Sequence, residues 1–134
     1  MSLDKALNEA MNNVPECLAG AYVDMSTGML LAVRTLDSHP QEALDLVAAA
    51  TADMFQGKTI IEIEDHFFRS RGGKGEAPHY FEEFLVFSLN LIHVFMRSKK
   101  HPEHVVTFVC RKSANVGMVL TRARGQVEKL EALV

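Results

Sequence analysis

The chain has 134 residues, of which 48% are apolar and 23% are charged, and its formal net charge is -3. This length suits one domain, and the apolar fraction is sufficient for a packed core, which excludes an intrinsically disordered chain. Lys and Arg are not in excess, which argues against nucleic acid as a partner. We therefore expect a single domain that spans residues 1–134 and does not bind nucleic acid.

The chain has two cysteines, Cys17 and Cys110, each inside an apolar, strand-like run. Neither belongs to a CxxC pair, so the sequence indicates neither a disulfide framework nor a zinc site. If the strands that hold them pair with each other, the two thiols become neighbours, and we expect them to be reduced. This cysteine usage suits a reducing, cytoplasmic compartment.

No segment resembles a targeting signal or a membrane span. Asp4 and Glu9 interrupt the apolar positions of the N-terminus, whereas a signal peptide has a continuous apolar core. The longest apolar-rich stretch, residues 84–96, is shorter than the roughly 20 residues that a membrane helix requires. We expect a protein without a membrane span.

The first third of the chain predicts a helix followed by a hairpin. Leucine and methionine recur at four-residue spacing over residues 3–11, which is typical of a short amphipathic helix that ends before Pro15. Two strand-like runs follow, at residues 18–24 and 29–34. Gly28, in the intervening MSTG turn, accepts a positive φ without strain.

A second helix is predicted to begin at Ser38, because Ser38 and Gln41 fit a capping box. Its apolar positions follow the spacing of one helical face, and they are Leu44, Val47, Ala48, Thr51, Met54 and Phe55. Gly57 leaves two alternatives, an end of the helix or a kink within it. Helical periodicity then resumes until about Arg71, and a strand is the weaker alternative there.

The rest of the chain predicts a loop, three strands and a final helix. The glycine-rich segment 71–79 is expected to be a mobile loop. Residues 83–89, 91–97 and 104–112 predict an antiparallel meander, and their apolar residues at odd and even positions indicate a sheet covered on both faces. Ser113 is expected to cap a last helix. The predicted buried side of that helix carries Val119, Ala123, Val127, Leu130 and Val134.

Several motifs resemble catalytic or ligand sites, but each lacks part of the required pattern. Residues 57–59 (GKT) resemble the end of a phosphate-binding loop, yet Ala52 stands where its first glycine belongs. The histidines lack the further Cys or His pair that would complete a zinc site. The carboxylates of residues 62–65 fit a solvated helix face, and His93 fits a core histidine. We therefore expect no enzyme, no cofactor and no metal.

The predicted order of elements is α-ββ-α-βββ-α. Together with CLAGAYVDMSTGMLLA at the first hairpin and VVTFVCRKSANVGMVL at the last strand and helix, it resembles the roadblock family of dynein-light-chain-like domains. The likeness covers most of the chain and includes Asp24 and Gly28 at the hairpin turn and Asn115 and Gly117 at the start of the last helix. Residues 58–79 depart from it, because this link is longer than the family's usual one.

The resemblance implies an α+β sandwich of profilin-like or roadblock architecture, with a five-stranded antiparallel sheet and helices on both faces. It also implies a non-catalytic, usually dimeric protein, since family members regulate or scaffold Ras-like GTPases and motor complexes. In such dimers the second helices pack side by side and the third strands meet edge to edge. The residues that map onto this interface are Leu44, Val47, Ala48, Thr51, Phe55, Phe84, Val86 and Ser88. We expect a homodimeric adaptor that binds a small Ras-like GTPase.

Physical chemistry also favours a dimer, because an apolar strand such as residues 84–88 at a sheet edge leaves backbone groups free to pair with another chain. Two alternatives stay open. In the first, the second helix covers only its own sheet, and the small residues 48–51 merely permit close internal packing. In the second, a pocket between helix and sheet makes the protein a small-molecule sensor.

Overall fold

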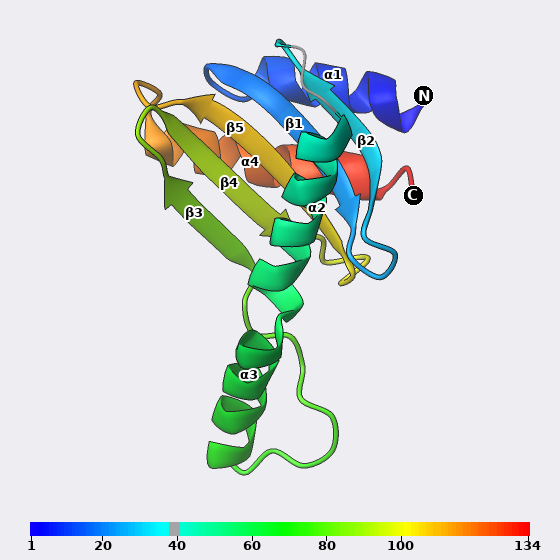
Figure 1. Ribbon diagram of the computed structural model, residues 1–134, viewed down its shortest axis with the longest axis vertical. Coiled ribbons are helices and arrows are strands. Elements are labelled where there is room, and N and C mark those ends of the chain that lie inside the picture. Colours follow the sequence, from blue (N-terminus) through cyan, green and yellow to red (C-terminus); the bar gives the residue numbers. More distant parts are fainter. Residues whose placement is uncertain (38–40) are drawn as a thin grey trace.

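The computed structural model describes residues 1–37 and 41–134. In chain order, its elements are α1 (Leu3–Asn13), β1 (Cys17–Asp24), β2 (Met29–Thr35), α2 (Gln41–Gln56), α3 (Lys58–Ser70), β3 (Glu83–Phe87), β4 (Leu91–Arg97), β5 (His104–Arg111) and α4 (Val116–Glu131). The strands form one antiparallel sheet in the order β2-β1-β5-β4-β3 (Figure 1). The predicted fold class is confirmed, with the second helical region divided in two. The predicted cap at Ser38 lies outside the described residues.

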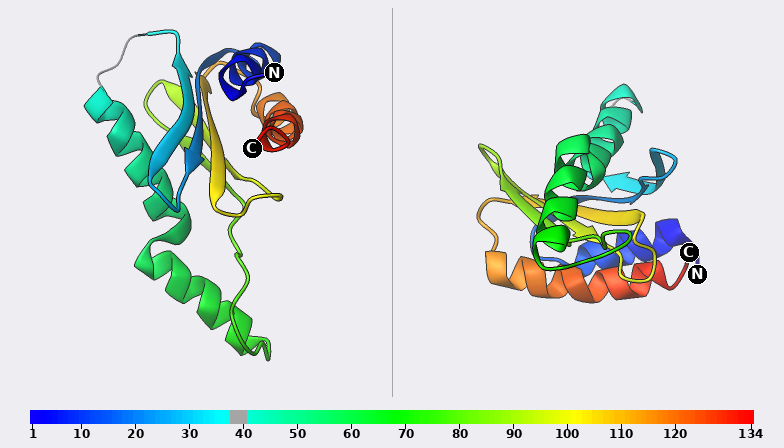
Figure 2. Two further views of the ribbon diagram at one scale, coloured as in Figure 1. Left: turned by 90° about the vertical axis from the view of Figure 1, so that its right-hand side faces the viewer. Right: turned by 90° about the horizontal axis from the view of Figure 1, so that it is seen from below.

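The helices lie in two layers, one on each face of the sheet. Figure 2 shows α1 and α4 side by side on one face and α2 on the opposite face. α3 continues beyond the end of the sheet, and residues 71–82 return from its tip to β3 without a regular element (Figure 1). None of the helices in the described part of the chain is long and apolar enough to cross a membrane.

The larger core lies between the sheet and the α1–α4 layer. Its largest fully buried side chains include Tyr22 of β1, Ile92 and Val94 of β4, and Phe108 of β5. α1 packs close to β1, because a Cβ at Gly20 would lie only 3.2 Å from side-chain atoms of the helix. A larger residue at position 20 would therefore push α1 away from the sheet.

Gly57 separates α2 from α3, which resolves the two alternatives in favour of a helix end. The residue has an extended backbone with φ -61° and ψ 157°. A Cβ there would lie 2.5 Å from the carbonyl oxygen of Asp53, so the junction requires glycine. The chain then becomes helical again for 13 residues in α3, and the alternative of a strand over this segment is wrong.

The start of the last helix differs from the prediction. Residues 112–114 form a turn instead, and Asn115 caps α4 by accepting a hydrogen bond from the Met118 N–H at 3.0 Å. The Ser113 hydroxyl donates to the Glu16 carboxylate at 2.8 Å, so this residue joins the turn to the start of β1. Because α4 ends at Glu131, Val134 lies beyond the helix and is exposed, in contrast to its predicted burial.

Candidate protein-binding interface

α2 covers only part of its face of the sheet. It crosses the strands diagonally and leaves β3, the start of β4 and the adjoining ends of β1 and β5 uncovered (Figure 1). Under the helix, Val23 of β1 and Val105 of β5 are fully buried. Further along the same strands, Ala19 and Val109 are only half-buried. We call the uncovered portion the open face, and its residues are Ala19, Val86, Leu91, His93 and Val109.

The open face is hollow at one end. A depression of about 670 Å³ lies there, and it is lined by Ala19, Leu91 and Val109 together with side chains from the ends of β2, β4 and β5. Charged residues also line it, among them Asp37, Arg111 and Lys112. Apolar and polar groups together are typical of protein–protein contact surfaces.

The outer side of α2 faces away from the chain's own core, and it carries exposed apolar residues beside the exposed charged residues Glu42 and Asp53. Leu46 is 70% exposed and Val47 is 45% exposed, and the small residues Ala49 and Ala50 are exposed beside them. Apolar residues that gather on the exposed side of a helix often mark a contact surface. The sheet buries one side of α2, and within this single chain nothing described covers the other.

β3 forms one edge of the sheet and is the third part of this surface. It pairs with β4 on one side only, so a row of its backbone N–H and C=O groups has no strand partner. Val86 is 42% exposed, and Leu89, in the turn that follows β3, is 94% exposed. Only Glu83, at the start of β3, is charged, and the apolar remainder of such an edge strand can pair with a further strand.

The eight residues predicted for a dimer contact divide into two groups. Ala48, Thr51 and Phe55 are buried against the chain's own sheet. The Thr51 hydroxyl donates to the Val47 carbonyl oxygen at 2.8 Å, and the Phe55 ring meets the Phe84 ring edge-on with centroids 4.8 Å apart. For these buried residues, internal packing is the role that the structure supports.

The other predicted residues reach the surface to different extents. Leu44, Phe84 and Ser88 are half-buried, and Val47 and Val86 are exposed. The predicted set does not include Leu46 or Leu89, which are more exposed than any of its members. Leu46 lies outside the apolar stripe that packs α2 on the sheet, and Leu89 lies in the turn after β3. The signal that identifies Leu46 is its exposed apolar side chain on the outer side of α2, beside Val47 and Ala50.

Ser88 and His93 form a hydrogen-bonded pair on the open face, between the end of β3 and the facing part of β4. Ser88 accepts or donates a hydrogen bond at 3.0 Å to the Nε2 atom of His93, depending on the histidine tautomer. Burial lowers the pKa of His93, because water no longer fully solvates the imidazolium. The imidazole is therefore neutral near pH 7 and adds no charge to the apolar surface.

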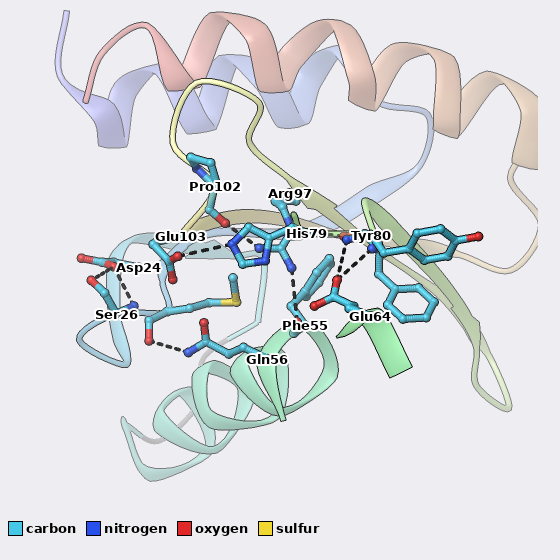
Figure 3. Close-up of polar contacts among 12 residues, drawn as sticks. Asp24, Ser26, Phe55, Gln56, Glu64, His79, Tyr80, Arg97, Pro102 and Glu103 are labelled. Carbon is cyan, nitrogen blue, oxygen red and sulfur yellow. Dashed lines mark hydrogen bonds and ion pairs between the residues drawn. The ribbon is translucent and has the colours of Figure 1, made fainter. Parts of the chain in front are cut away.

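Arg97 fixes α2 to the rest of the chain (Figure 3). Its guanidinium donates to three backbone carbonyl oxygens: Phe55 at 3.2 Å, Phe81 at 3.1 Å and Pro102 at 2.7 Å. It also lies 5.1 Å from the centre of the Phe55 ring. Burial lowers the pKa of Arg97, and the nearby Glu64 carboxylate opposes that shift. One buried cation thus joins the end of α2 to the start of β3 and to the β4–β5 loop.

The candidate catalytic residues do not converge. Glu64 is buried, but its carboxylate accepts from the backbone N–H groups of Tyr80 at 2.6 Å and Phe81 at 3.2 Å, so it anchors the return from α3 (Figure 3). His79 contacts Glu103 at 3.6 Å on the surface. In residues 1–37 and 41–134, no group of three or more His, Cys, Asp or Glu side chains is placed to hold a metal ion.

Comparison with known proteins identifies the architecture. No protein-family model and no curated protein matches the sequence. Among solved structures, an MglB with a tetrameric arrangement is similar at a TM-score of 0.71 and 16% identity, over 98% of this chain and 86% of that chain. The Roadblock/LC7 domain from Streptomyces avermitilis gives 0.70 and 13%, over 98% and 97%. Profilin II from Acanthamoeba castellanii gives 0.61 and 11%, over 98% of each chain. The chain therefore has a roadblock-like fold.

Proposed function

We propose that this protein is a non-catalytic homodimeric adaptor or regulator that binds a small Ras-like GTPase. The observation that carries the proposal is the apolar surface shared by the outer side of α2, the open face and the edge of β3. The family resemblance supports the choice of partner class, because roadblock domains regulate or scaffold such GTPases. One of the similar structures, an MglB, has a tetrameric arrangement, which supports self-association for this fold.

The geometry suits a twofold dimer. In such a dimer the same patch on each chain faces its copy, so a self-complementary surface is required. The partner's α2 would fill the depression on the open face, and the two β3 strands would pair edge to edge. This arrangement buries Leu46, Val47 and Val86, which are apolar and exposed in the single chain.

A charge placed on this surface tests the dimer. Val47→Asp and Val86→Asp are each expected to give a folded monomer, because either change buries a carboxylate in an apolar contact. Met29→Asp is the matched control, since Met29 is 60% exposed but lies on β2, at the opposite edge of the sheet. Light scattering gives the molar mass and circular dichroism checks the fold. A dimer that survives both substitutions, or that Met29→Asp alone dissociates, contradicts the proposed interface.

The GTPase requires a separate experiment. The immobilised wild-type protein is expected to retain small GTPases of its host in at least one nucleotide state, and Val86→Asp is expected to retain less if the binding surface spans both protomers. Purified GTPases loaded with GDP or with a non-hydrolysable GTP analogue identify that state. If no host GTPase binds in either state, the proposed partner class is wrong even if the dimer is present.

A small-molecule sensor is less well supported. A cavity of about 390 Å³ does lie between α4 and the edge of the sheet. However, Arg124 at its wall already donates two hydrogen bonds of 2.9 Å to Glu83. Glu131 already accepts from the Ser98 hydroxyl and from the Lys99 and Lys100 N–H groups. These polar groups are engaged within the chain, so they do not indicate a ligand.

A further inference from the structure

The two cysteines lie directly opposite each other on adjacent strands. Cys17 at the start of β1 is the register partner of Cys110 near the end of β5. The backbone N–H of Arg111 donates to the Glu16 carbonyl oxygen at 3.0 Å, as in a non-hydrogen-bonded pair, and the strand register shifts directly after the cysteines, between Cys17 and Ala19. In such pairs the side chains approach most closely, with Cα atoms about 4.5 Å apart.

This geometry is within reach of a disulfide bond. Disulfides join residues whose Cα atoms are roughly 4.4–6.8 Å apart, so a non-hydrogen-bonded pair lies at the short end of that range. A disulfide that small thiols can reach exchanges with them, so it can be reduced again. Both thiols are free in this structure. A cross-strand bond here is therefore expected to form and break with the surrounding redox conditions.

The two thiols differ in access. Cys110 is fully buried in the core between the sheet and the α1–α4 layer, whereas Cys17 is half-buried at the rim of that core. The Cys17 thiol donates to the Ala19 carbonyl oxygen at 3.2 Å. The hydrogen bond from the Cys110 thiol lowers the pKa of Cys17 and raises that of Cys110. An external reagent therefore reacts with Cys17 first, and the buried Cys110 thiol lies next to the product of that reaction.

We propose that Cys17 and Cys110 form a reversible modification site, in which a small-molecule disulfide converts the two thiols to an intramolecular disulfide. The Cys17 thiolate attacks one sulfur of the reagent, the S–S bond of the reagent breaks, and one small thiol leaves with the proton that Cys17 released. The Cys110 sulfur then attacks the Cys17 sulfur and displaces the second small thiol, which takes the proton from Cys110. Two electrons pass from the protein to the reagent.

The bond would link the start of β1 to the end of the central strand β5. There, Glu16 has a positive φ of 50° and accepts a hydrogen bond from Ser113, so the turn before β1 is already held against the turn after β5. Joining residues so far apart in the chain restricts the unfolded state, which stabilises the folded one. The oxidised form should therefore unfold at a higher temperature than the reduced form.

The test uses the native protein and glutathione disulfide as the reagent. Mass spectrometry is expected to show the loss of two hydrogen atoms and no adduct, with both thiols unavailable to alkylation and restored by dithiothreitol. Cys110→Ala should stop at one glutathione adduct on Cys17, and Cys17→Ser should not react while folded. Thermal melting checks that each variant folds.

Three results would overturn the proposal. The first is a wild-type protein that stops at the glutathione adduct, because the two sulfurs would then be unable to meet. The second is a Cys17→Ser variant that reacts as fast as the wild type, because Cys110 would then be directly accessible. The third is a disulfide between two chains, seen as a reducible dimer on a gel. None of these readouts depends on dimerisation through α2 or on a GTPase.

Discussion

The two faces of the sheet are covered to different extents, although the same five strands form both. On the α1–α4 face, side chains at the centre of the sheet are buried, as Val94 and Phe108 are. On the α2 face, the neighbouring positions His93 and Val109 stay half-exposed. Adjacent residues of one strand therefore lie in a closed core on one side and on an incomplete surface on the other.

The difference follows from the number of helices on each face. Five strands at about 4.8 Å spacing make a sheet roughly 20 Å wide. A helix with its side chains is about 10 Å across, so two helices are needed to cover a face. α1 and α4 supply two, whereas α2 stands alone because Gly57 directs α3 away from the sheet. The α2 face is thus one helix short, and a partner chain can supply the missing layer.

The largest effect is expected where α2 is held to the sheet. Arg97→Met keeps a long apolar stem but leaves the carbonyl oxygens of Phe55, Phe81 and Pro102 without their donor. A buried polar group that loses its partner costs about 1–3 kcal/mol, so a loss on the order of 3 kcal/mol in the free energy of unfolding is expected. Urea denaturation measures this loss. Relative to the wild type, the substitution should speed amide hydrogen exchange more in α2 than in α1.

The matched control is Arg124→Met. Arg124 makes two hydrogen bonds, to Glu83, but its side chain is 54% exposed and that of Glu83 is 34% exposed. An exposed ion pair contributes less than about 1 kcal/mol. If the two substitutions destabilise the protein equally, then Arg97 does not hold α2 through buried hydrogen bonds, and the α2 face is secured in some other way.

Most of the fold is predictable from the sequence, because periodicity reports which side of an element is apolar. The two hairpin runs and the meander match the observed strands to within about one residue, apart from the third strand, which ends two residues early at Phe87. The prediction that Ser113 caps α4 is wrong, because both Ser113 and Asn115 suit that role and only the turn that ends β5 selects Asn115. Local propensity alone does not carry that information.

The candidate interface was less predictable. Sequence spacing correctly grouped Ala48, Thr51 and Phe55 on one side of α2, but it does not say whether that side meets the chain's own sheet or a second chain. The structure places this side inside. It leaves Leu46 exposed on the outer side. Leu46 can be identified as a candidate interface residue only when the other side of α2 is known to pack on the chain's own sheet. Interfaces of this kind depend on which apolar residues remain exposed after the monomer has folded.

A second prediction compares the two faces through the same substitution. Val106→Thr on β5 places a hydroxyl in the closed core, where Val106 is fully buried, and a loss of about 2 kcal/mol is expected. Val86→Thr keeps the same shape on the exposed edge strand, where a change within about 0.5 kcal/mol is typical. Urea titrations of both variants at one low protein concentration give the comparison. Similar losses would mean that the open face is as closed as the core.

The smallest effect concerns protonation on the open face. Burial depresses the pKa of His93 below its value in the unfolded chain, which is about 6.5. The neutral form therefore stabilises the fold above about pH 6.5, and this contribution is lost as the pH falls through the folded-state pKa. The effect should stay below about 1.4 kcal/mol, the value of one full pKa unit, because the imidazole is only half-buried.

His93→Gln separates this effect from the rest of the acid response. The variant should lose less stability than the wild type between pH 7.5 and pH 5, measured by urea denaturation at each pH. His66→Gln serves as the control, because His66 is exposed on α3, away from the sheet. If a partner chain covers the open face, then His93 becomes more deeply buried, and the dimer should weaken on acidification more steeply than the fold itself. An unchanged dimer mass at pH 5 and low protein concentration would mean that the partner chain does not cover the open face.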